Sequence, residues 1–319
     1  MGGSLSLRTP AVQELPMTLQ DALQRTLVLD GGLGSELERK GCDLSHQLWS
    51  ARVLLDQPER VAQVHRDYLN AGAECISTAT YQISSLGFRR AGFTDAQAHD
   101  ALRNAVNLAK QVRDEYQHAH GRRALVAASI GPYGAVLADG SEFHGNYPLT
   151  FDELIDFHSP RMAVLAATEP DLFACETIPS LLEARAMLAS LRHSPHARAW
   201  FTFTCKDDRH VAHGEDLTDC VRELDSDPQV VALGVNCTAP RWITGLLGVL
   251  RSATRKPIVV YPNSGRRWDA AARHWIGASH LDPAAMVPQW RRAGAQWIGG
   301  CCGTTPQDIA SIHRMLRAN

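Results

Sequence analysis

Eight short apolar segments alternate with helical segments along almost the whole 319-residue chain. Near-continuous apolar runs of this length are typical of parallel strands that are buried on both faces. Eight strand–helix repeats without a linker or a shift in composition predict a (β/α)8 barrel of the TIM type, formed as a single domain by residues 21–319. An open, doubly wound sheet is the structural alternative. The predicted strands are Thr26–Asp30, Cys75–Thr80, Ala124–Ile130, Asp171–Glu176, Ala199–Thr204, Val230–Asn236, Pro257–Tyr261 and Gln296–Ile298.

Some of the intervening helices have recognisable first residues. Thr150–Glu153 has the pattern of a capping box, and Thr305–Pro306 combines a capping residue with a proline at the first helical position. Both patterns predict a helix that begins directly after the threonine. Residues 1–20, by contrast, are polar and interrupted by prolines, so we expect a loosely ordered N-terminal tail.

The overall charge favours a small-molecule enzyme over a nucleic-acid-binding or membrane protein. The chain has 32 Lys and Arg against 34 Asp and Glu, a net charge of -2, so it has no field that would attract a polyanion. No apolar run reaches the roughly 18 residues of a membrane span. The N-terminus also lacks the pattern of a secretory signal, and we therefore expect a cytoplasmic location.

The carboxyl ends of the predicted strands carry the chemistry-bearing residues. In a (β/α)8 barrel all these ends meet at one rim, where active sites are built. Carboxylates, an amide, thiols and glycines predominate there. The segments are Asp30-Gly31-Gly32, Thr80-Tyr81-Gln82, Ser129 to Pro132, Cys175-Glu176-Thr177, Thr204-Cys205, Val235-Asn236-Cys237, Tyr261 to Ser264 and Gly299 to Gly303.

Three of the eight cysteines form a candidate metal site. Cys237 follows the sixth predicted strand and Cys301–Cys302 follow the eighth, so a barrel would bring them to one rim although 64 positions (301 − 237) separate them. Glycines on both sides of Cys301–Cys302 allow the unusual backbone angles that two converging neighbours require. Three thiolates suit zinc, and three protein ligands leave the open fourth position of a catalytic site.

Two structural alternatives stay open for these cysteines. Cysteine is often buried as a small apolar residue, and the Cys301–Cys302 pair could form a tight turn or a strained vicinal disulfide. We interpret four of the other five cysteines as buried residues of this apolar kind, namely Cys75, Cys175, Cys205 and Cys220, and assign no role to Cys42.

A zinc ion with three thiolates carries a net charge of −1 and is therefore a poor Lewis acid for making hydroxide. An incoming thiol, however, would bind as its thiolate, because coordination removes the thiol proton. The surplus negative charge keeps that sulfur nucleophilic. The candidate site therefore predicts alkyl transfer to sulfur.

Four motifs at the strand ends resemble the signature of the zinc-dependent homocysteine S-methyltransferase family, over essentially everything from about residue 26 onward. They are Asp30-Gly31-Gly32, Glu176-Thr177, Gly234 to Cys237 and Gly299 to Gly303. Longer segments resemble the single-domain branch that uses S-methylmethionine or S-adenosylmethionine rather than the branch that uses betaine. These segments are Leu48–Ala51, His65–Tyr68, Gly131–Gly134, Leu137–Ser141 and Val260–Gly265.

The resemblance implies an enzyme that holds one Zn²⁺ per chain through Cys237, Cys301 and Cys302. Its substrates would be two small molecules, homocysteine and a methylsulfonium donor, with no nucleic acid or membrane as a partner. Transfer of the donor's methyl group to the thiolate of homocysteine would give methionine.

The same resemblance implies a role for several other residues at the rim. Asp30 and Glu176 would bind the ammonium of homocysteine, and backbone N–H groups near Gly31–Gly32 its carboxylate; a salt bridge with a nearby arginine is the alternative for either acid. Tyr81 would lie beside the transferring methyl, where an aromatic ring stabilises a sulfonium, unless it serves only in packing. Asn236 would either bind substrate or fix the metal loop.

Two long connections have little regular patterning, residues 131–150 and residues 263–280. A connection of this length over a site is typical of a lid, so we expect the first to cover the donor. The second carries Trp268 and Trp275, which either line the site or anchor the loop.

Three competing functions stay open on the sequence alone. Betaine could replace the methylsulfonium donor, or selenocysteine or another thiol could replace homocysteine. From a different class, the chain could be a non-catalytic zinc or thiol-redox protein, in which case the acids at neighbouring strand ends would have no purpose.

Overall fold

The computed structural model describes residues 17–269 and 274–318. Eight parallel strands form one sheet in the order β1-β10-β7-β6-β5-β4-β3-β2, and a parallel bridge between Leu29 and Cys75 joins its two edges. The predicted barrel is confirmed, and the open sheet is excluded. The strands are β1 (Leu27–Val28), β2 (Cys75–Ser77), β3 (Leu125–Ile130), β4 (Leu172–Ile178), β5 (Ala199–Phe203), β6 (Val230–Asn236), β7 (Ile258–Tyr261) and β10 (Ala295–Ile298).

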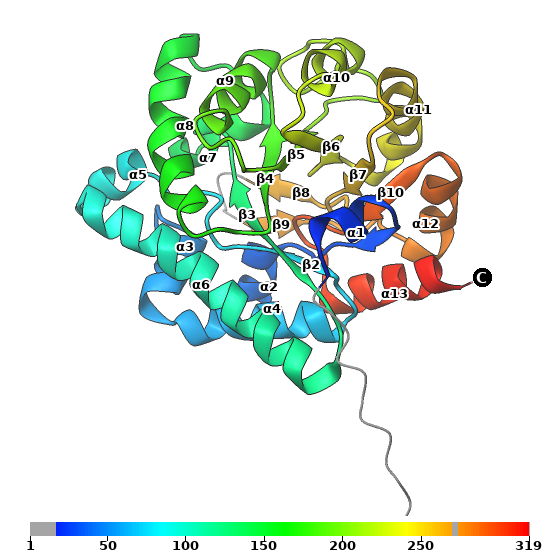
Figure 1. The fold of residues 1–319 in the computed structure, drawn as a ribbon, viewed down its shortest axis with the longest axis horizontal. Coiled ribbons are helices and arrows are strands. Elements are labelled where there is room, and N and C mark those ends of the chain that lie inside the picture. Colours follow the sequence, from blue (N-terminus) through cyan, green and yellow to red (C-terminus); the bar gives the residue numbers. More distant parts are fainter. Residues whose placement is uncertain (1–16, 270–273, 319) are drawn as a thin grey trace, which may run out of the picture.

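Helices surround the strands, as Figure 1 shows. Capping boxes at Thr150 and Thr305 begin α8 and α13, as predicted. The helices are α1 (Leu19–Leu23), α2 (Leu33–Arg39), α3 (Ser50–Asp56), α4 (Pro58–Asn70), α5 (Ser85–Arg90), α6 (Asp95–His120), α7 (Tyr133–Leu137), α8 (Phe151–Ala166), α9 (Leu181–Leu191), α10 (Leu217–Asp225), α11 (Ile243–Ala253), α12 (Pro283–Arg292) and α13 (Pro306–Arg317), with short 3-10 turns η1 (Ser141–Phe143) and η2 (Pro240–Trp242). Within the described ranges, no helix is long and apolar enough to cross a bilayer.

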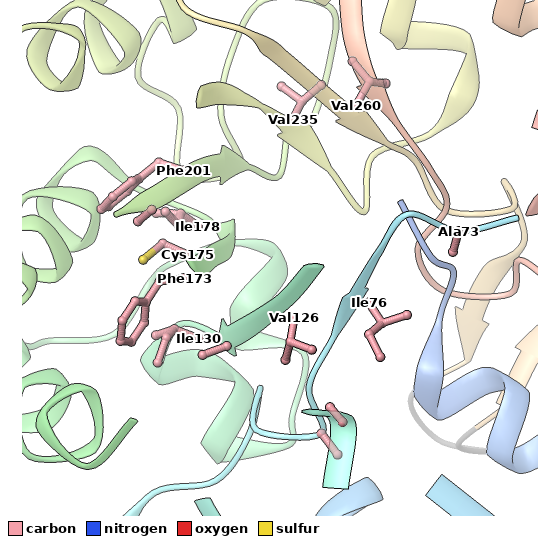
Figure 2. Packing of buried hydrophobic residues seen from close by; sticks show 14 of the residues in the cluster. Ala73, Ile76, Val126, Ile130, Phe173, Cys175, Ile178, Phe201, Val235 and Val260 are labelled. Carbon is pink, nitrogen blue, oxygen red and sulfur yellow. The ribbon is translucent and has the colours of Figure 1, made fainter. Parts of the chain in front are cut away.

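The strands bury side chains on both faces, which explains their continuous apolar sequences. One face packs against the helices: Figure 2 shows Phe173 and Cys175 of β4 and Phe201 of β5 in this outer layer. The other face fills the barrel interior, where Trp200 and Trp297 stack edge to face with their ring centroids 5.9 Å apart. A filled interior leaves the carboxyl rim as the place for a site.

The first residues of the folded part differ from the sequence prediction. Thr18 caps α1 with a capping box, and Met17, which is 6% exposed, packs with Ala22 into the interior cluster. The Trp297 indole donates to the carbonyl of Ala22 (3.2 Å), so α1 is held against the interior side chains of the barrel. The tail therefore does not extend to residue 20, and residues 1–16 lie outside the described part of the chain.

Two further differences concern the strand ends and a loop. β4 continues to Ile178, beyond Glu176, through a register shift against β5 between Cys175 and Ile178. The connection over residues 263–280 contains an antiparallel hairpin of β8 (Arg267–Asp269) and β9 (His274–Ile276), which the sequence did not indicate. Trp268 and Trp275, which were expected either to line the site or to anchor this loop, lie in the hairpin, but their side chains are outside the described part.

The contact between β6 and β7 gives a test of the fold. A Cβ at Gly234 would lie 1.8 Å from the backbone oxygen of Val259, so Gly234→Ala should destabilise the protein by at least about 3 kcal/mol, because strand backbone must move. Urea unfolding measures the change. Gly248→Ala is the matched control: this exposed glycine of α11 has open space around it, and alanine should stabilise the helix by up to about 1 kcal/mol. Equal stabilities of the two variants would contradict the packing.

Candidate metal centre and active site

Barrel closure brings the three predicted thiols together. Cys237 directly follows β6, and Cys301–Cys302 follow β10, which lies two strands away in the sheet. The Sγ atoms of Cys237 and Cys302 are 3.5 Å apart and those of Cys301 and Cys302 are 4.0 Å apart, and all three lie within 4.8 Å of one another. The cysteines are free, so the vicinal disulfide is not formed.

The backbone at this rim aims the thiols at one point. Cys237 has a φ of 46°, in the left-handed region, and its N–H donates to the carbonyl of Tyr261 (3.1 Å). Cys301 N–H donates to Pro262 O (2.8 Å), and Ser264 N–H donates to Cys302 O (2.8 Å). Hydrogen bonds to the end of β7 and to the residues that follow it thus fix the backbone of all three cysteines. A positive φ such as that of Cys237 is common at functional sites.

Three thiols this close cannot all ionise without a cation. The pKa of Cys302 lies well below its usual value, because hydrogen bonds from Cys237 and then Cys301 stabilise its thiolate. The pKa of Cys237 is raised well above it by the hydrogen bonding to Cys301 and Cys302 and then by burial. A soft or borderline divalent cation among the sulfurs would offset the repulsion between three thiolates. The three sulfur donors therefore fit a thiolate-bound metal such as zinc.

The two predicted carboxylates lie buried in the same cavity. Asp30 accepts a hydrogen bond from Ser77 N–H (2.7 Å), and burial raises its pKa well above the ordinary value. Glu176 accepts from the hydroxyl of Ser129, and burial raises its pKa to about 7. Among the described residues neither forms an ion pair with an arginine or a lysine, so the salt-bridge alternative is not what the structure shows. Two buried acids of this kind are suited to a cationic ligand.

A β-bulge sets the direction of Glu176. The next residue, Thr177, has a φ of 59° at the register shift between β4 and β5. The side chain of Asn236 holds this bulge, because its Oδ1 accepts from Thr177 N–H (2.7 Å) and its Nδ2 donates to Thr177 Oγ1 (2.8 Å). Asn236 also lies 4.0 Å from the sulfur of Cys301. Its amide is therefore engaged within the protein, which favours the loop-fixing alternative over substrate binding.

The predicted glycines serve close packing as well as ligand access. A Cβ at Gly32 would lie 2.5 Å from the carbonyl oxygen of Cys301, and one at Gly31 would lie 2.8 Å from Thr304 Oγ1. Gly32 N–H donates to Thr304 Oγ1 (3.2 Å). Because the N–H of Gly32 already has this partner, we predict that the N–H of Gly31 rather than that of Gly32 binds a carboxylate.

A cavity of about 780 Å³ connects these groups at the rim. Its wall includes Asp30, Tyr81 and Glu176 together with all three thiols. Tyr81 packs against Gly131, where a Cβ would lie 2.6 Å from the ring. The cavity is large enough for two amino-acid-sized ligands, and it opens beside the sulfur atoms.

The sequence prediction missed several residues of this wall. Tyr261 hydrogen-bonds with Thr202 Oγ1 (2.7 Å) and accepts from the Trp200 indole (3.0 Å), which fixes its hydroxyl inside the cavity. Its place at the end of a strand was a usable signal. Glu142 also lines the cavity; it belongs to the connection after β3 that was expected to cover the donor, but the sequence did not single it out.

Asn236 gives a test of how the site is held. Asn236→Ala should lower the free energy of unfolding by about 2–4 kcal/mol, because the buried N–H and hydroxyl of Thr177 both lose their partner. Denaturant unfolding measures the loss. Asn104→Ala, on the exposed side of α6, should change stability by less than about 0.7 kcal/mol. A loss for Asn236→Ala as small as that of the control would contradict the proposed support of the bulge.

The chain is similar over most of its length to methyltransferases that act on sulfur or selenium amino acids by name. The chain is 45% identical over 298 residues to the homocysteine S-methyltransferase YbgG of Bacillus subtilis, covering 92% of this chain and 95% of that protein. It is 45% identical to the homocysteine S-methyltransferase of Escherichia coli, at 91% and 94% coverage. It is also 42% identical to the selenocysteine methyltransferase of Astragalus bisulcatus, at 92% and 93% coverage.

A solved structure and a family model agree with these relatives. The metallated form of the homocysteine methyltransferase MmuM from Escherichia coli superposes with a TM-score of 0.83 at 44% identity, covering 92% of this chain and 96% of that one. Residues 27–316 match the family model for homocysteine S-methyltransferase. The predicted resemblance is thus confirmed, and the chain belongs to the homocysteine S-methyltransferase family.

Proposed function

We propose that this protein transfers a methyl group from a methylsulfonium donor, S-methylmethionine or S-adenosylmethionine, to the thiolate of homocysteine, giving methionine. The observation that carries the proposal is one cavity that combines three converging thiols with two buried carboxylates free of any lysine or arginine partner among the described residues. Membership of the family makes methyl transfer to a thiol the first reaction to test, and it leaves the non-catalytic alternative without support.

Cys237, Cys301 and Cys302 would hold one zinc ion per chain. Bound zinc would keep an acceptor thiol ionised at neutral pH and leave its sulfur nucleophilic. The protein's own contribution is rigidity, because the hydrogen bonds to the backbone of all three cysteines fix the sulfur positions. The metallated form of the Escherichia coli relative is consistent with a metal at this site.

The acceptor would bind between the thiols and the buried acids. Asp30 and Glu176 would bind its ammonium, since a cation lowers the cost of keeping two carboxylates ionised in a buried place. Each acid is oriented by a serine, Ser77 for Asp30 and Ser129 for Glu176. The N–H of Gly31 would bind the carboxylate of the acceptor. Bound in this way, homocysteine would direct its thiol end toward the cysteines.

The donor would bind on the other side of the acceptor sulfur, against Tyr81. The ring can stabilise the positive sulfur by cation–π attraction, and Gly131 allows it to pack closely against the connection after β3. Methyl transfer cancels the charge of the sulfonium against that of the thiolate, so a cavity that excludes water favours the reaction. The protein thereby acts mainly by positioning the two sulfur atoms in line.

Selenocysteine is the second candidate acceptor, because a relative 42% identical to this chain carries the name selenocysteine methyltransferase. Its amino-acid end would bind Asp30 and Glu176 in the same way. Parallel assays with homocysteine and selenocysteine, each with S-methylmethionine and with betaine, separate the alternatives for acceptor and donor. Free thiols at the site need a reducing compartment, so the cytoplasm is the location we propose.

Metal content gives the first test. Protein purified under reducing conditions should contain about one zinc per chain, and Cys302→Ser should lose both zinc and methyl transfer, because only two thiolates remain. Atomic emission spectroscopy and a methionine assay measure the two losses. Cys220→Ala, which changes a buried thiol of α10, should keep both. Full activity in metal-free wild-type protein would overturn the zinc proposal.

Glu176 gives the second test. Glu176→Gln removes the charge but keeps the shape, so the KM for homocysteine should rise about tenfold or more, as expected for a lost charged hydrogen bond, while the zinc content stays near one per chain. Steady-state kinetics at saturating donor measures KM. Glu223→Gln, on the exposed face of α10, is the control and should leave KM unchanged. If the two variants had the same KM for homocysteine, Glu176 would not bind the acceptor.

A further inference from the structure

The charged side chains of the cavity wall are predominantly acidic. Six acidic residues line the cavity, and the described residues of its wall include no lysine or arginine. The acids are Asp30, Glu38, Asp43, Asp139, Glu142 and Glu176. Such a wall favours cationic ligands. Homocysteine brings one ammonium, for which Asp30 and Glu176 suffice, so the remaining acids call for a second cation.

Glu142 differs from the other acids in how its carboxylate is satisfied. Asp43 and Asp139 accept hydrogen bonds from the backbone of Ser45 and Ser141, and Glu38 is exposed to solvent. The Oε2 atom of Glu142, in contrast, is buried and has no hydrogen-bond partner among the described residues. A buried carboxylate oxygen without a partner is costly, and a cationic ligand would satisfy it.

The structure around Glu142 is fixed, so its position in the wall is a property of the fold. Glu142 lies in η1, whose preceding residue, Gly140, has a φ of 90°. The backbone nitrogen of Glu142 packs so closely on Gly134 that a Cβ there would lie 2.4 Å from it. Both glycines allow η1 to fold back on α7 (Tyr133–Leu137), and that turn directs Glu142 to the cavity.

Glu142 shares the connection after β3 with Gly131, against which Tyr81 packs, so it belongs to the side of the cavity proposed for the donor. Its charge is, after burial, the next cause that raises the pKa of Tyr81 well above the ordinary value, so carboxylate and ring are electrostatic neighbours. Asp30 follows β1 and Glu176 lies in β4, whereas Glu142 comes from the connection that runs from β3 to α8. Glu142 thus enters the cavity from a different element than the two acids assigned to the acceptor.

We propose that Glu142 binds the α-ammonium of the methylsulfonium donor and thereby selects amino-acid sulfonium donors over donors without an ammonium. This inference rests on the proposed function. The ammonium is a better partner than the sulfonium, because its charge persists through methyl transfer. A carboxylate paired with the sulfonium would stabilise the substrate more than the transition state and would slow the reaction.

Glu142→Gln tests this role in the full-length zinc-loaded enzyme. The KM for S-methylmethionine should rise by about 10- to 100-fold, the range expected for loss of a charged hydrogen bond. Because the ammonium is bound equally in ground and transition states, kcat at saturating donor should stay within about twofold, as should the KM for homocysteine.

A donor analogue without the ammonium distinguishes loss of the contact between Glu142 and the ammonium from a general change in the electrostatic potential of the cavity. Dimethylsulfoniopropionate carries a dimethylsulfonium and a carboxylate but no ammonium. Its inhibition constant against S-methylmethionine should be the same in wild type and Glu142→Gln. If Glu142→Gln weakened the binding of both compounds equally, Glu142 would not bind the ammonium. An unchanged KM for S-methylmethionine would exclude any role of Glu142 in donor binding.

Two controls make the outcome unambiguous. Glu38→Gln removes the same charge from the exposed mouth of the cavity and should change the donor KM far less; an equal change would mean that the overall potential, not Glu142, is responsible. The Tm of Glu142→Gln should equal or exceed that of wild type, because the variant loses an unpaired buried carboxylate. If wild type uses no methylsulfonium donor at all, the proposed function fails as well, whereas an active wild type with an unaffected variant contradicts only this inference.

Discussion

The site depends on the pairing of β6, β7 and β10 in a closed barrel. Asn236, the last residue of β6, pairs with Tyr261 at the end of β7. The N–H of Cys237 donates to the carbonyl of Tyr261, and the N–H of Cys301 donates to that of Pro262, directly after β7. Cys237 and Cys301 therefore leave the sheet side by side although 64 positions (301 − 237) separate them. A slip of either strand by one residue would turn its cysteine to the opposite face. The strand register thus holds the candidate metal ligands in place.

Backbone strain near the strand ends does the fine positioning. Cys237 and Thr177 both adopt a positive φ, which costs on the order of 1 kcal/mol or more per residue and persists only where the surroundings impose it. Asn236 connects the two, since it lies next to Cys237 in the chain and bonds to both the N–H and the hydroxyl of Thr177. One buried amide thus couples the loop that carries a candidate metal ligand to the bulge at Thr177, the residue after Glu176.

The sequence predicted the parts of this arrangement that follow from periodicity and topology. Continuous apolar runs indicated the barrel, and strand order alone placed Cys237, Cys301 and Glu176 at one rim. It could not predict the bulge after Glu176, because that depends on a contact with Asn236 far away in the chain. Glu142 was not singled out for the same reason, although the connection that carries it was expected to cover the donor: its place in the wall results from the fold of η1 against α7, which no local pattern encodes.

Negative charge is concentrated around the cavity, and the proposed ligands would compensate it: a metal cation for the thiolates and cationic groups on both substrates for the acids. The central proposal is that the thiolate of homocysteine binds a zinc ion held by the three cysteines. X-ray absorption at the zinc edge, on protein with and without homocysteine, tests it most directly. We predict three sulfur neighbours and one lighter atom in the free protein, and four sulfur neighbours at about 2.3 Å after homocysteine is added. A zinc environment that homocysteine leaves unchanged would contradict the account.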